Sequence, residues 1–166
     1  MSLFQHEVSI RKESLKFSSA HMTVFPNGTK ESLHGHNYTT EVTLVLKDIS
    51  FKKMIPFNEI KVLIKEICEA WDEKVLLPKK CPFFKLKTLG KHEVDFFLCQ
   101  SHYVLPKDEV VLLDLDNIST ETLAQAACSK LVSKLASRTS LNLVEQIKFR
   151  IEESPGQGAS CIWKLQ

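Results

Sequence analysis

A pair of histidines at the start of an alternating run constrains this chain more than any other feature. Residues 33–38 read Leu-His-Gly-His-Asn-Tyr, and apolar and polar residues alternate in the stretch that follows, up to Leu46. This alternation predicts a β-strand over residues 36–47, and residues two apart on a strand point to the same face. His34 and His36 can therefore direct two imidazoles at one point, and Gly35 between them lets another group approach closely. The segment has the geometry of half a metal site.

Three further strands are expected from the same kind of pattern. Residues 5–23 alternate well enough for one long strand, which pairs with residues 36–47 as an antiparallel hairpin. Two closing strands are predicted over residues 146–153 and 159–165, with a Ser-Pro-Gly-Gln-Gly turn between them. Strands at both ends of the chain favour an antiparallel sheet.

Two helices are predicted between the strand pairs. The first begins at Pro56, carries apolar residues at helical spacing, and ends at Leu77-Pro78. The second begins after Ser119, which is placed to cap it, and Glu121 lies in the first turn, where the helix dipole favours an anion.

The region between the helices, residues 78–116, is the least regular part of the sequence. It is expected to contain a short hairpin of residues 94–99 and 102–105 and a further apolar run over 110–115. The chain of 166 residues is therefore expected to be one α+β domain, a four-stranded antiparallel sheet with two helices on one face and an insert at about 78–116.

The charge, the apolar runs and the cysteines of the chain indicate which partners and which cellular compartment to expect. The net charge of +2 does not suggest a nucleic-acid or acidic-membrane surface, and no run of about 18 apolar residues suggests a transmembrane helix. The five cysteines are odd in number and form no CxxC motif, and the N-terminus does not resemble a signal peptide. We therefore expect reduced thiols in a cytoplasmic protein.

His21 is the natural third ligand for the metal site. It ends the first predicted strand, which pairs with the strand that His36 begins, and a catalytic zinc site needs three protein ligands and an open position. The alternative is that these are three ordinary hydrogen-bonded histidines. His6, His92 and His102, which have no comparable partner, are interpreted as surface or loop residues.

Several segments together resemble the 6-pyruvoyltetrahydropterin synthase / 6-carboxytetrahydropterin synthase family. The three-histidine pattern is the specific part of the resemblance, which extends over nearly the whole chain. The segments that carry it are Phe17–His21, Leu33–Tyr38, Met54–Lys61, Trp71–Leu76, Asn117–Ala124 and Ile151–Pro155. The resemblance implies a T-fold, in which subunits join edge to edge into a barrel, usually a homohexamer of two trimers, with active sites between subunits.

The resemblance also implies roles for individual residues. His21, His34 and His36 would bind Zn²⁺, and Glu153 would hold the ring of a pterin substrate by accepting hydrogen bonds from its amino group and ring N–H. Backbone groups around Ile118 and Ser119 resemble a second pterin contact. Without the motif, Glu153 would be interpreted as a surface carboxylate.

The acid–base residues depart from the family pattern. The usual catalytic cysteine stands four residues before the first histidine of the pair, where this chain has Lys30. Glu31 follows it and resembles a subgroup in which glutamate replaces the cysteine and dihydroneopterin is cleaved to 6-hydroxymethyldihydropterin; burial that raised its pKa towards neutrality would suit it as a base. The family's Asp-His pair is here Asp72-Glu73, either a proton relay or two solvated charges.

The leading hypothesis is thus a zinc-dependent lyase acting on a 7,8-dihydroneopterin-type side chain, with Glu31, Asp72 and Glu73 as catalytic residues. The enzyme alternatives are a 6-carboxytetrahydropterin synthase and the triphosphate-eliminating 6-pyruvoyltetrahydropterin synthase. An alternative of another class is a catalytically silent homologue that binds zinc and a pterin, which the loss of both the cysteine and the histidine would favour.

Overall fold

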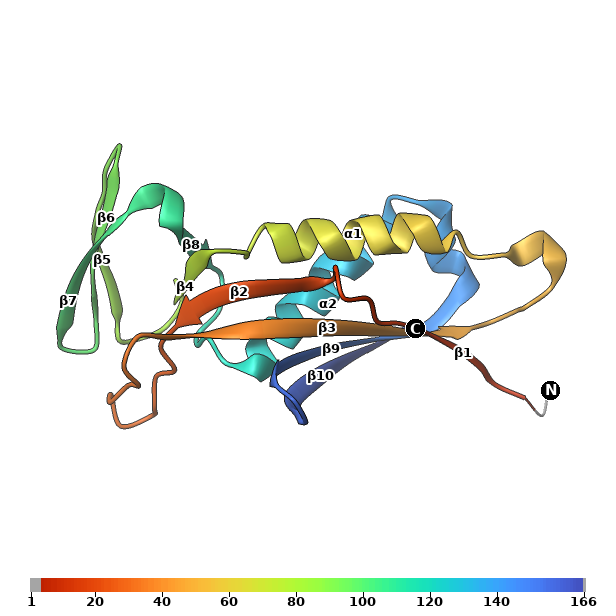
Figure 1. The fold of residues 1–166 in the computed structure, drawn as a ribbon, viewed down its shortest axis with the longest axis horizontal. Helices are drawn as coiled ribbons and strands as arrows, with labels where there is room; N and C mark the ends of the chain where they lie inside the picture. Colours follow the sequence, from red (N-terminus) through yellow and green to blue (C-terminus); the bar gives the residue numbers. More distant parts are fainter. Residues whose placement is uncertain (1–3, 166) are drawn as a thin grey trace.

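The computed structural model describes residues 4–165 and shows one large sheet covered on one face by two helices, with a smaller sheet at one end (Figure 1). The helices and strands are, in chain order, β1 (His6–Ile10), β2 (Lys16–His21), β3 (His34–Leu46), α1 (Phe57–Glu69), β4 (Lys74–Pro78), β5 (Phe84–Leu89), β6 (Glu93–Leu98), β7 (Ser101–Pro106), β8 (Val110–Leu113), α2 (Thr120–Ala136), β9 (Val144–Ser154) and β10 (Gln157–Lys164). The predicted α+β class is confirmed.

The large sheet contains more strands than the predicted four. Its order is β10-β9-β3-β2-β4-β8, with β1 also pairing to β3. The four expected strands are the antiparallel set β10, β9, β3 and β2, whereas β4 and β8 are added in parallel on the β2 side. The outer strands β10 and β8 leave one side of each without a strand partner within residues 4–165.

The predicted strand over residues 5–23 is two strands. Both pair with β3 in tandem: β1 lies against the half that ends at Leu46, and β2 lies against the half that begins at His34. Between them the chain turns, with the Leu15 amide donating to the Lys12 carbonyl, and this turn brings Leu15 into the core.

The predicted end of the first helix at Leu77-Pro78 is wrong. Helix α1 ends at Glu69, and Glu73 has a positive φ of 55°. The chain is redirected by two contacts with β2: the Asp72 carboxylate accepts from the Ser18 amide, and the Glu73 amide donates to the Ser18 carbonyl. Residues 74–78 consequently run parallel to β2 as a strand, where burial of Leu76 and Leu77 outweighs continuation of the helix.

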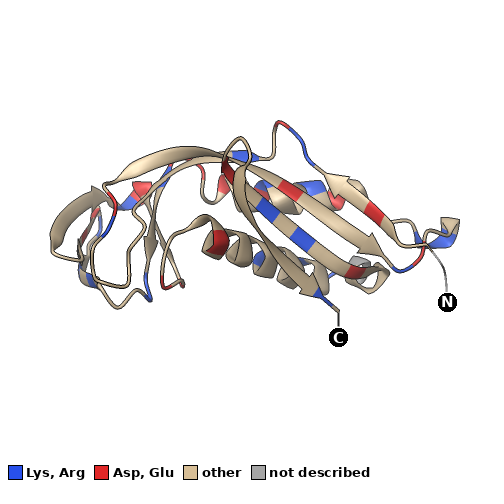
Figure 2. Ribbon diagram, turned by 90° about the horizontal axis from the view of Figure 1, so that it is seen from below, with Lys and Arg blue, Asp and Glu red and all other residues tan. Residues whose placement is uncertain are grey.

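The core lies between the two helices and the sheet. The predicted apolar stripes of both helices are buried, including Leu63 and Ile67 of α1 and Leu131 of α2. They pack against the side chains of one sheet face, such as Val42 and Phe149. Charged residues recur along the strands of the sheet (Figure 2). Arg150 and Glu152 alternate with the buried Phe149 and Ile151 and so project from the opposite face, where Glu152 contacts both Arg150 and Arg11. Within residues 4–165 no helix is long and apolar enough to cross a membrane.

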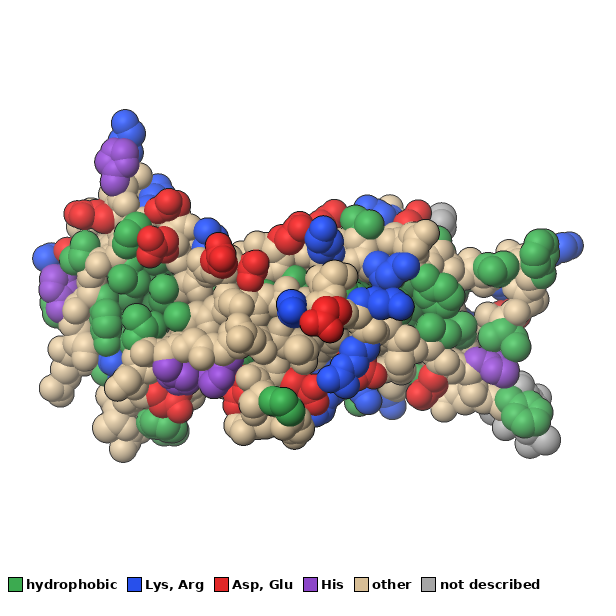
Figure 3. Space-filling view, in the orientation of Figure 1, with side chains coloured by type: hydrophobic (Ala, Val, Ile, Leu, Met, Phe, Trp, Pro, Cys, Tyr) green, Lys and Arg blue, Asp and Glu red, His purple; other side chains and the backbone are tan. Residues whose placement is uncertain are grey.

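The insert contributes a separate three-stranded sheet with the order β5-β6-β7, and the predicted hairpin around Gln100-Ser101 is its β6–β7 turn. Apolar side chains are exposed on this part of the molecule (Figure 3). A second buried cluster joins the insert to the main sheet; it comprises Met22, Val24, Leu77, Cys81, Val94, Phe96 and Leu98. The segment that follows β2 thus packs directly on the insert.

Candidate metal and pterin site

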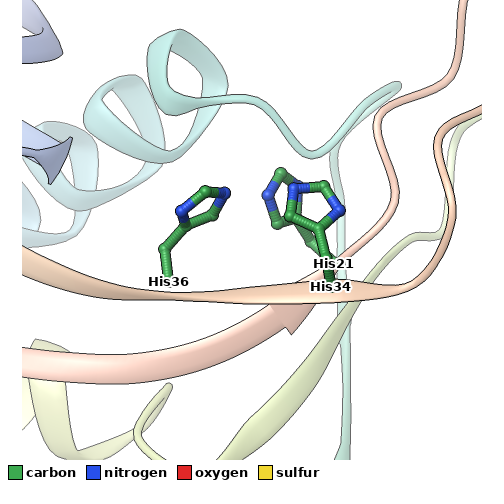
Figure 4. A group of neighbouring side chains, drawn as sticks. All are labelled: His21, His34 and His36. Carbon is green, nitrogen blue, oxygen red and sulfur yellow. The ribbon is translucent and has the colours of Figure 1, made fainter.

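The three predicted histidines meet at one end of the helix-covered sheet face. In the β2–β3 register, His21 is directly opposite His34, and His36 is opposite Ser19. The ring centroids are 4.7 Å apart for His21 and His34, 4.9 Å for His34 and His36, and 5.4 Å for His21 and His36. All three rings rise from the same side of the strands, below the segment that leads into α2 (Figure 4).

Hydrogen bonds orient two of the rings for metal binding. The Nδ1 atom of His21 is 3.0 Å from the Ile118 carbonyl, and the Nδ1 atom of His34 is 2.8 Å from the Ser32 carbonyl. A carbonyl acceptor at Nδ1 keeps the proton there and leaves Nε2 free as a ligand. One nitrogen from each of His21, His34 and His36 lies within 4.8 Å of the other two.

The environment of His21 fits a bound cation. Its side chain is almost fully buried, and its Nε2 atom has no hydrogen-bond partner among residues 4–165. Burial lowers the pKa of His21, so the ring is neutral at physiological pH, which is the form that binds metals. A buried nitrogen without a partner costs free energy, and a metal ion at this point would remove that cost. The donor set therefore fits zinc.

Glu31 lies beside the histidines on the loop between β2 and β3. One of its carboxylate oxygens is 4.0 Å from Nε2 of His34 and accepts from the Thr23 amide at 3.2 Å. Hydrogen bonding with Thr23 lowers the pKa of Glu31, and the side chain is 39% exposed, so the condition that burial raises this pKa is not met. The carboxylate is therefore ionised at neutral pH and able to accept a proton.

Glu153 lies on the other flank of the cluster, near the end of β9. One of its oxygens is 4.0 Å from Nε2 of His36 and accepts from the Thr120 hydroxyl at 2.9 Å. The other oxygen accepts from the Gln157 side-chain amide. The carboxylate is thus held in place by two donors and directs its acceptors towards the pocket.

The start of helix α2 closes the site from above. Ser119 is the predicted N-cap, and a capping box with Thr122 fixes the first turn. The side chain of Ile118 is fully buried, whereas its carbonyl accepts from the Thr23 hydroxyl at 3.3 Å in addition to contacting His21. Ile118 therefore contributes a backbone group to the site.

These residues surround one pocket of about 330 Å³, lined by His21, Thr23, Glu31, His34, His36, Ser119, Thr120, Glu121, Glu153 and Gln157. The sequence analysis did not assign Thr23, Thr120, Glu121 or Gln157 to the site. Thr23 could have been found by its spacing of two from His21, whereas the other three are near the site only because the start of α2 and the β9–β10 turn converge there.

Asp72 and Glu73 are not among the residues that line this pocket. The Asp72 carboxylate is bonded to the Ser18 amide at 2.7 Å. Glu73 lines a second hollow of about 380 Å³ with Ser18, Asn37 and also His36. This hollow therefore meets the histidine cluster at His36, but neither Asp72 nor Glu73 lines the pocket that contains Glu31 and Glu153.

Comparison with known proteins gives related sequences and related structures from one enzyme family. A sequence profile of the family described as 6-pyruvoyl tetrahydropterin synthase matches residues 9–162. A Methanocaldococcus jannaschii protein, provisionally named a 6-carboxy-5,6,7,8-tetrahydropterin synthase, is 33% identical over 146 residues, which cover 87% of this chain and 88% of the relative. A Pyrococcus abyssi protein with the same provisional name is 25% identical over 166 residues, 96% of this chain and 95% of the relative.

Solved structures agree with the expected T-fold. The 6-pyruvoyl tetrahydropterin synthase of Plasmodium falciparum superposes with a TM-score of 0.87 at 26% identity, covering 97% of this chain and 99% of that one. The enzyme of the same name from Plasmodium vivax gives a TM-score of 0.88 at 22% identity, covering 98% and 99% of the two chains. The latter likeness concerns the fold alone.

Proposed function

Because this chain belongs to the 6-pyruvoyl tetrahydropterin synthase family, we propose that it is a zinc-dependent lyase acting on the side chain of a 7,8-dihydroneopterin-type substrate. Its relatives support a function in pterin biosynthesis of the 6-pyruvoyl or 6-carboxytetrahydropterin synthase kind. The observation that carries the specific proposal is that Glu31, at 4.0 Å from Nε2 of His34, occupies the pocket that holds the three histidines.

His21, His34 and His36 would hold the metal through one nitrogen each. A bound zinc ion would acidify the side-chain hydroxyls of the substrate and stabilise negative charge on oxygen. Three neutral ligands suit this chemistry because they leave the full positive charge of the ion in the pocket, and burial keeps the His21 ring in the neutral form.

Glu31 would be the base. Its carboxylate would accept the proton from the hydroxyl on the second side-chain carbon of dihydroneopterin. As a carbonyl forms there, the bond between the first and second carbons breaks, and the first carbon takes up a proton. The products are 6-hydroxymethyldihydropterin and glycolaldehyde. In the Plasmodium vivax 6-pyruvoyltetrahydropterin synthase, whose fold is similar, a glutamate replaced by alanine or cysteine is described as a catalytic residue of that protein.

Glu153 would bind the pterin ring. A carboxylate presents two acceptors to the planar pair of donors formed by the amino group and ring N–H of a pterin. Thr120 and Gln157 each donate a hydrogen bond to one oxygen of Glu153, and they would keep the carboxylate oriented towards the pterin. Ser119 and the backbone of Ile118 would provide the second contact, at the other side of the pocket.

The proposed assembly is a homohexamer of two trimers in which strand edges pair between subunits. The outer strands β8 and β10 lack a partner on one side in the described chain, as such pairing requires. Asp72 and Glu73 do not line the pocket that contains Glu31 and Glu153 in their own chain, so in this assembly they would act on a pocket across a subunit boundary. A cytoplasmic location is proposed from the odd number of cysteines, which favours reduced thiols.

A second enzymatic candidate is a 6-carboxytetrahydropterin synthase. The 33% identity to the Methanocaldococcus relative favours it. The substitution of Lys30-Glu31 and Asp72-Glu73 for the family's cysteine and histidine counts against it, and against the triphosphate-eliminating synthase. The candidate of another class, a silent protein that binds zinc and a pterin, is favoured by the same substitutions.

The test is to incubate the zinc-loaded protein with dihydroneopterin and, separately, with its triphosphate, and to identify the products by mass. We expect 6-hydroxymethyldihydropterin from at least one substrate. A 6-pyruvoyl or 6-carboxy product would instead support one of the synthase alternatives. Pterin binding without turnover of either substrate would support the silent protein.

The base assignment needs its own variants. Glu31→Gln should abolish turnover while leaving the zinc content at one ion per chain, because the three ligands remain. Glu13→Gln is the matched control, since that side chain is 93% exposed and lies in the turn before β2, at the other end of that strand from His21. Turnover by Glu31→Gln at the wild-type rate would show that another group is the base.

A further inference from the structure

The loop that carries Glu31 is folded as a small hairpin that rests on the insert. Val24 and Lys30 form an antiparallel bridge, and the Phe25 amide donates to the Thr29 carbonyl. The Glu31 amide continues this pairing by donating to the Thr23 carbonyl at 3.0 Å. Val24 is buried in the cluster that includes Phe96 of the insert, so one arm of the hairpin is anchored by apolar contacts.

The tip of the hairpin also touches the insert. Gly28 has a φ of 81°, and a Cβ atom at this residue would be 3.0 Å from the Phe83 ring. Phe83 directly precedes strand β5. The close approach and the left-handed backbone both require glycine here. The hairpin therefore has a fixed position against the insert at its tip as well as at Val24.

Lys30 makes the polar part of this contact, one residue before the proposed base. Its ammonium group donates to the Tyr103 hydroxyl at 2.7 Å and to the Glu31 carbonyl at 3.2 Å. The same nitrogen is 5.2 Å from the centre of the Tyr103 ring. Tyr103 is itself held by stacking on the fully buried Phe96, with ring centroids 5.3 Å apart. The contacts run from the insert core to the backbone of Glu31.

Among the described residues Lys30 forms no ion pair with the carboxylate of Glu31, the proposed base; the lysine holds the carbonyl of that residue instead. A direct ion pair would stabilise the ionised carboxylate and weaken it as a base. Holding the backbone fixes where the side chain starts without occupying its oxygens. Immobilising a lysine costs side-chain entropy, and two hydrogen bonds and a ring contact offset that cost here.

We propose that Lys30 and Tyr103 are positioning residues, through which the insert fixes the Glu31 carboxylate beside His34. This inference rests on the proposed function, because it takes Glu31 as the base. It gives the insert a role in the site although no insert residue lines the pocket. Reactions are sensitive to such placement, since an error of about 1 Å can lower a rate about 100-fold.

Steady-state kinetics of the zinc-loaded protein test the proposal. Tyr103→Phe keeps the stacked ring and removes the acceptor, and Lys30→Met removes the cation. Both should lower kcat by about 10- to 100-fold, with KM and zinc content within about threefold of wild type, because Glu153 and the histidines are untouched. Lys30→Arg keeps a cationic donor and should restore most of kcat.

A control on the same strand separates positioning from general loosening of the insert. His102 neighbours Tyr103 on β7 but stacks on Phe97 and contacts Asp95, outside the second buried cluster. His102→Gln should therefore leave kcat unchanged. Wild-type kcat in Tyr103→Phe and Lys30→Met, or an equal loss in His102→Gln, would overturn the proposal while the lyase function stands.

Hydrogen exchange distinguishes failure of this inference from failure of the proposed function. If the wild-type protein turns over neither substrate, the lyase function is wrong, and amide exchange of residues 23–31 still reports the coupling. Exchange should be at least about tenfold faster in Tyr103→Phe and Lys30→Met than in wild type or His102→Gln. Unchanged exchange in both variants would refute the coupling of the insert to this hairpin.

Discussion

Metal removal is expected to destabilise the protein through His21. In the metal-free chain its Nε2 atom is buried without a partner, which costs roughly 1–3 kcal/mol. A metal ion bound to His21, His34 and His36 would remove that cost and bind only the folded state. Zinc should consequently raise the free energy of unfolding and the melting temperature, whereas a chelator should lower both.

The size of the effect follows from mass action. Free zinc at about 100 times its dissociation constant stabilises a folded protein by about 2.7 kcal/mol. For a chain of 166 residues each kcal/mol moves the melting temperature by roughly 2–4 °C. The expected increase is therefore about 5–10 °C, measured at one protein concentration because a homo-oligomer would make the melting temperature concentration-dependent.

Differential scanning calorimetry of chelated and zinc-loaded samples checks this. His34→Ala removes a ligand whose side chain is 38% exposed, so the metal-free variant should melt near the wild type while losing most of the zinc-induced shift. His92→Ala is the control, since His92 is exposed on the insert, and it should keep the full shift. A full shift in His34→Ala, or none in the wild type, would refute the assigned ligand set.

Three further outcomes are expected. Tyr38→Phe removes a buried hydroxyl that has no partner in the structure, so the metal-free variant should be as stable as wild type or more stable by up to about 1 kcal/mol in urea unfolding. Ser119→Ala removes the cap of α2 and should cost about 1 kcal/mol in the same assay, whereas Ser119→Thr should cost less. Burial raises the pKa of the Cys68 thiol from about 9 to about 11. The thiol of the unfolded chain therefore ionises at lower pH than that of the folded chain, so the free energy of unfolding should fall between pH 9 and 11. The fall should be smaller in Cys68→Ala, and an equal fall in the variant and the wild type would contradict the pKa shift.

The sequence predicted those elements whose pattern is unambiguous. Strand β3 and the two helix stripes follow directly from periods of two and 3.6, and the Ser119 cap has a local cause. Strand β4 was missed because Val75–Leu77 had been assigned to the end of a helix, and only contacts between Ser18 and the Asp72-Glu73 turn decide otherwise. The segment of β8 was recognised as an apolar run over residues 110–115 but was not assigned to the large sheet. Such long-range contacts leave no periodic trace in the sequence.

The candidate site divides in the same way. The histidines and Glu31 lie close together along β2, β3 and their connection, so spacing alone brings most of them together. Glu153 could be assigned only by family resemblance, and it lies in the pocket with them. Thr120 and Gln157 required the packing of α2 on β9 and β10. The catalytic role of Asp72 and Glu73 stays a prediction, because neither residue lines the pocket that contains the histidines and Glu31.

The β2–β3 register has a consequence for how mutations can damage the site. Phe17 and Tyr38, which stack in the core, are on the same sheet face as His21, His34 and His36. A shift of β3 by one residue would move Tyr38, His34 and His36 to the opposite face together, and a shift of β2 would do the same to Phe17 and His21. Burial of the aromatic pair therefore also stabilises the strand register that brings the three histidines together, and a chain with a shifted register would lose this packing as well. Mutations that abolish metal binding in a folded protein should therefore be substitutions of the histidines themselves, because a shifted strand would prevent folding.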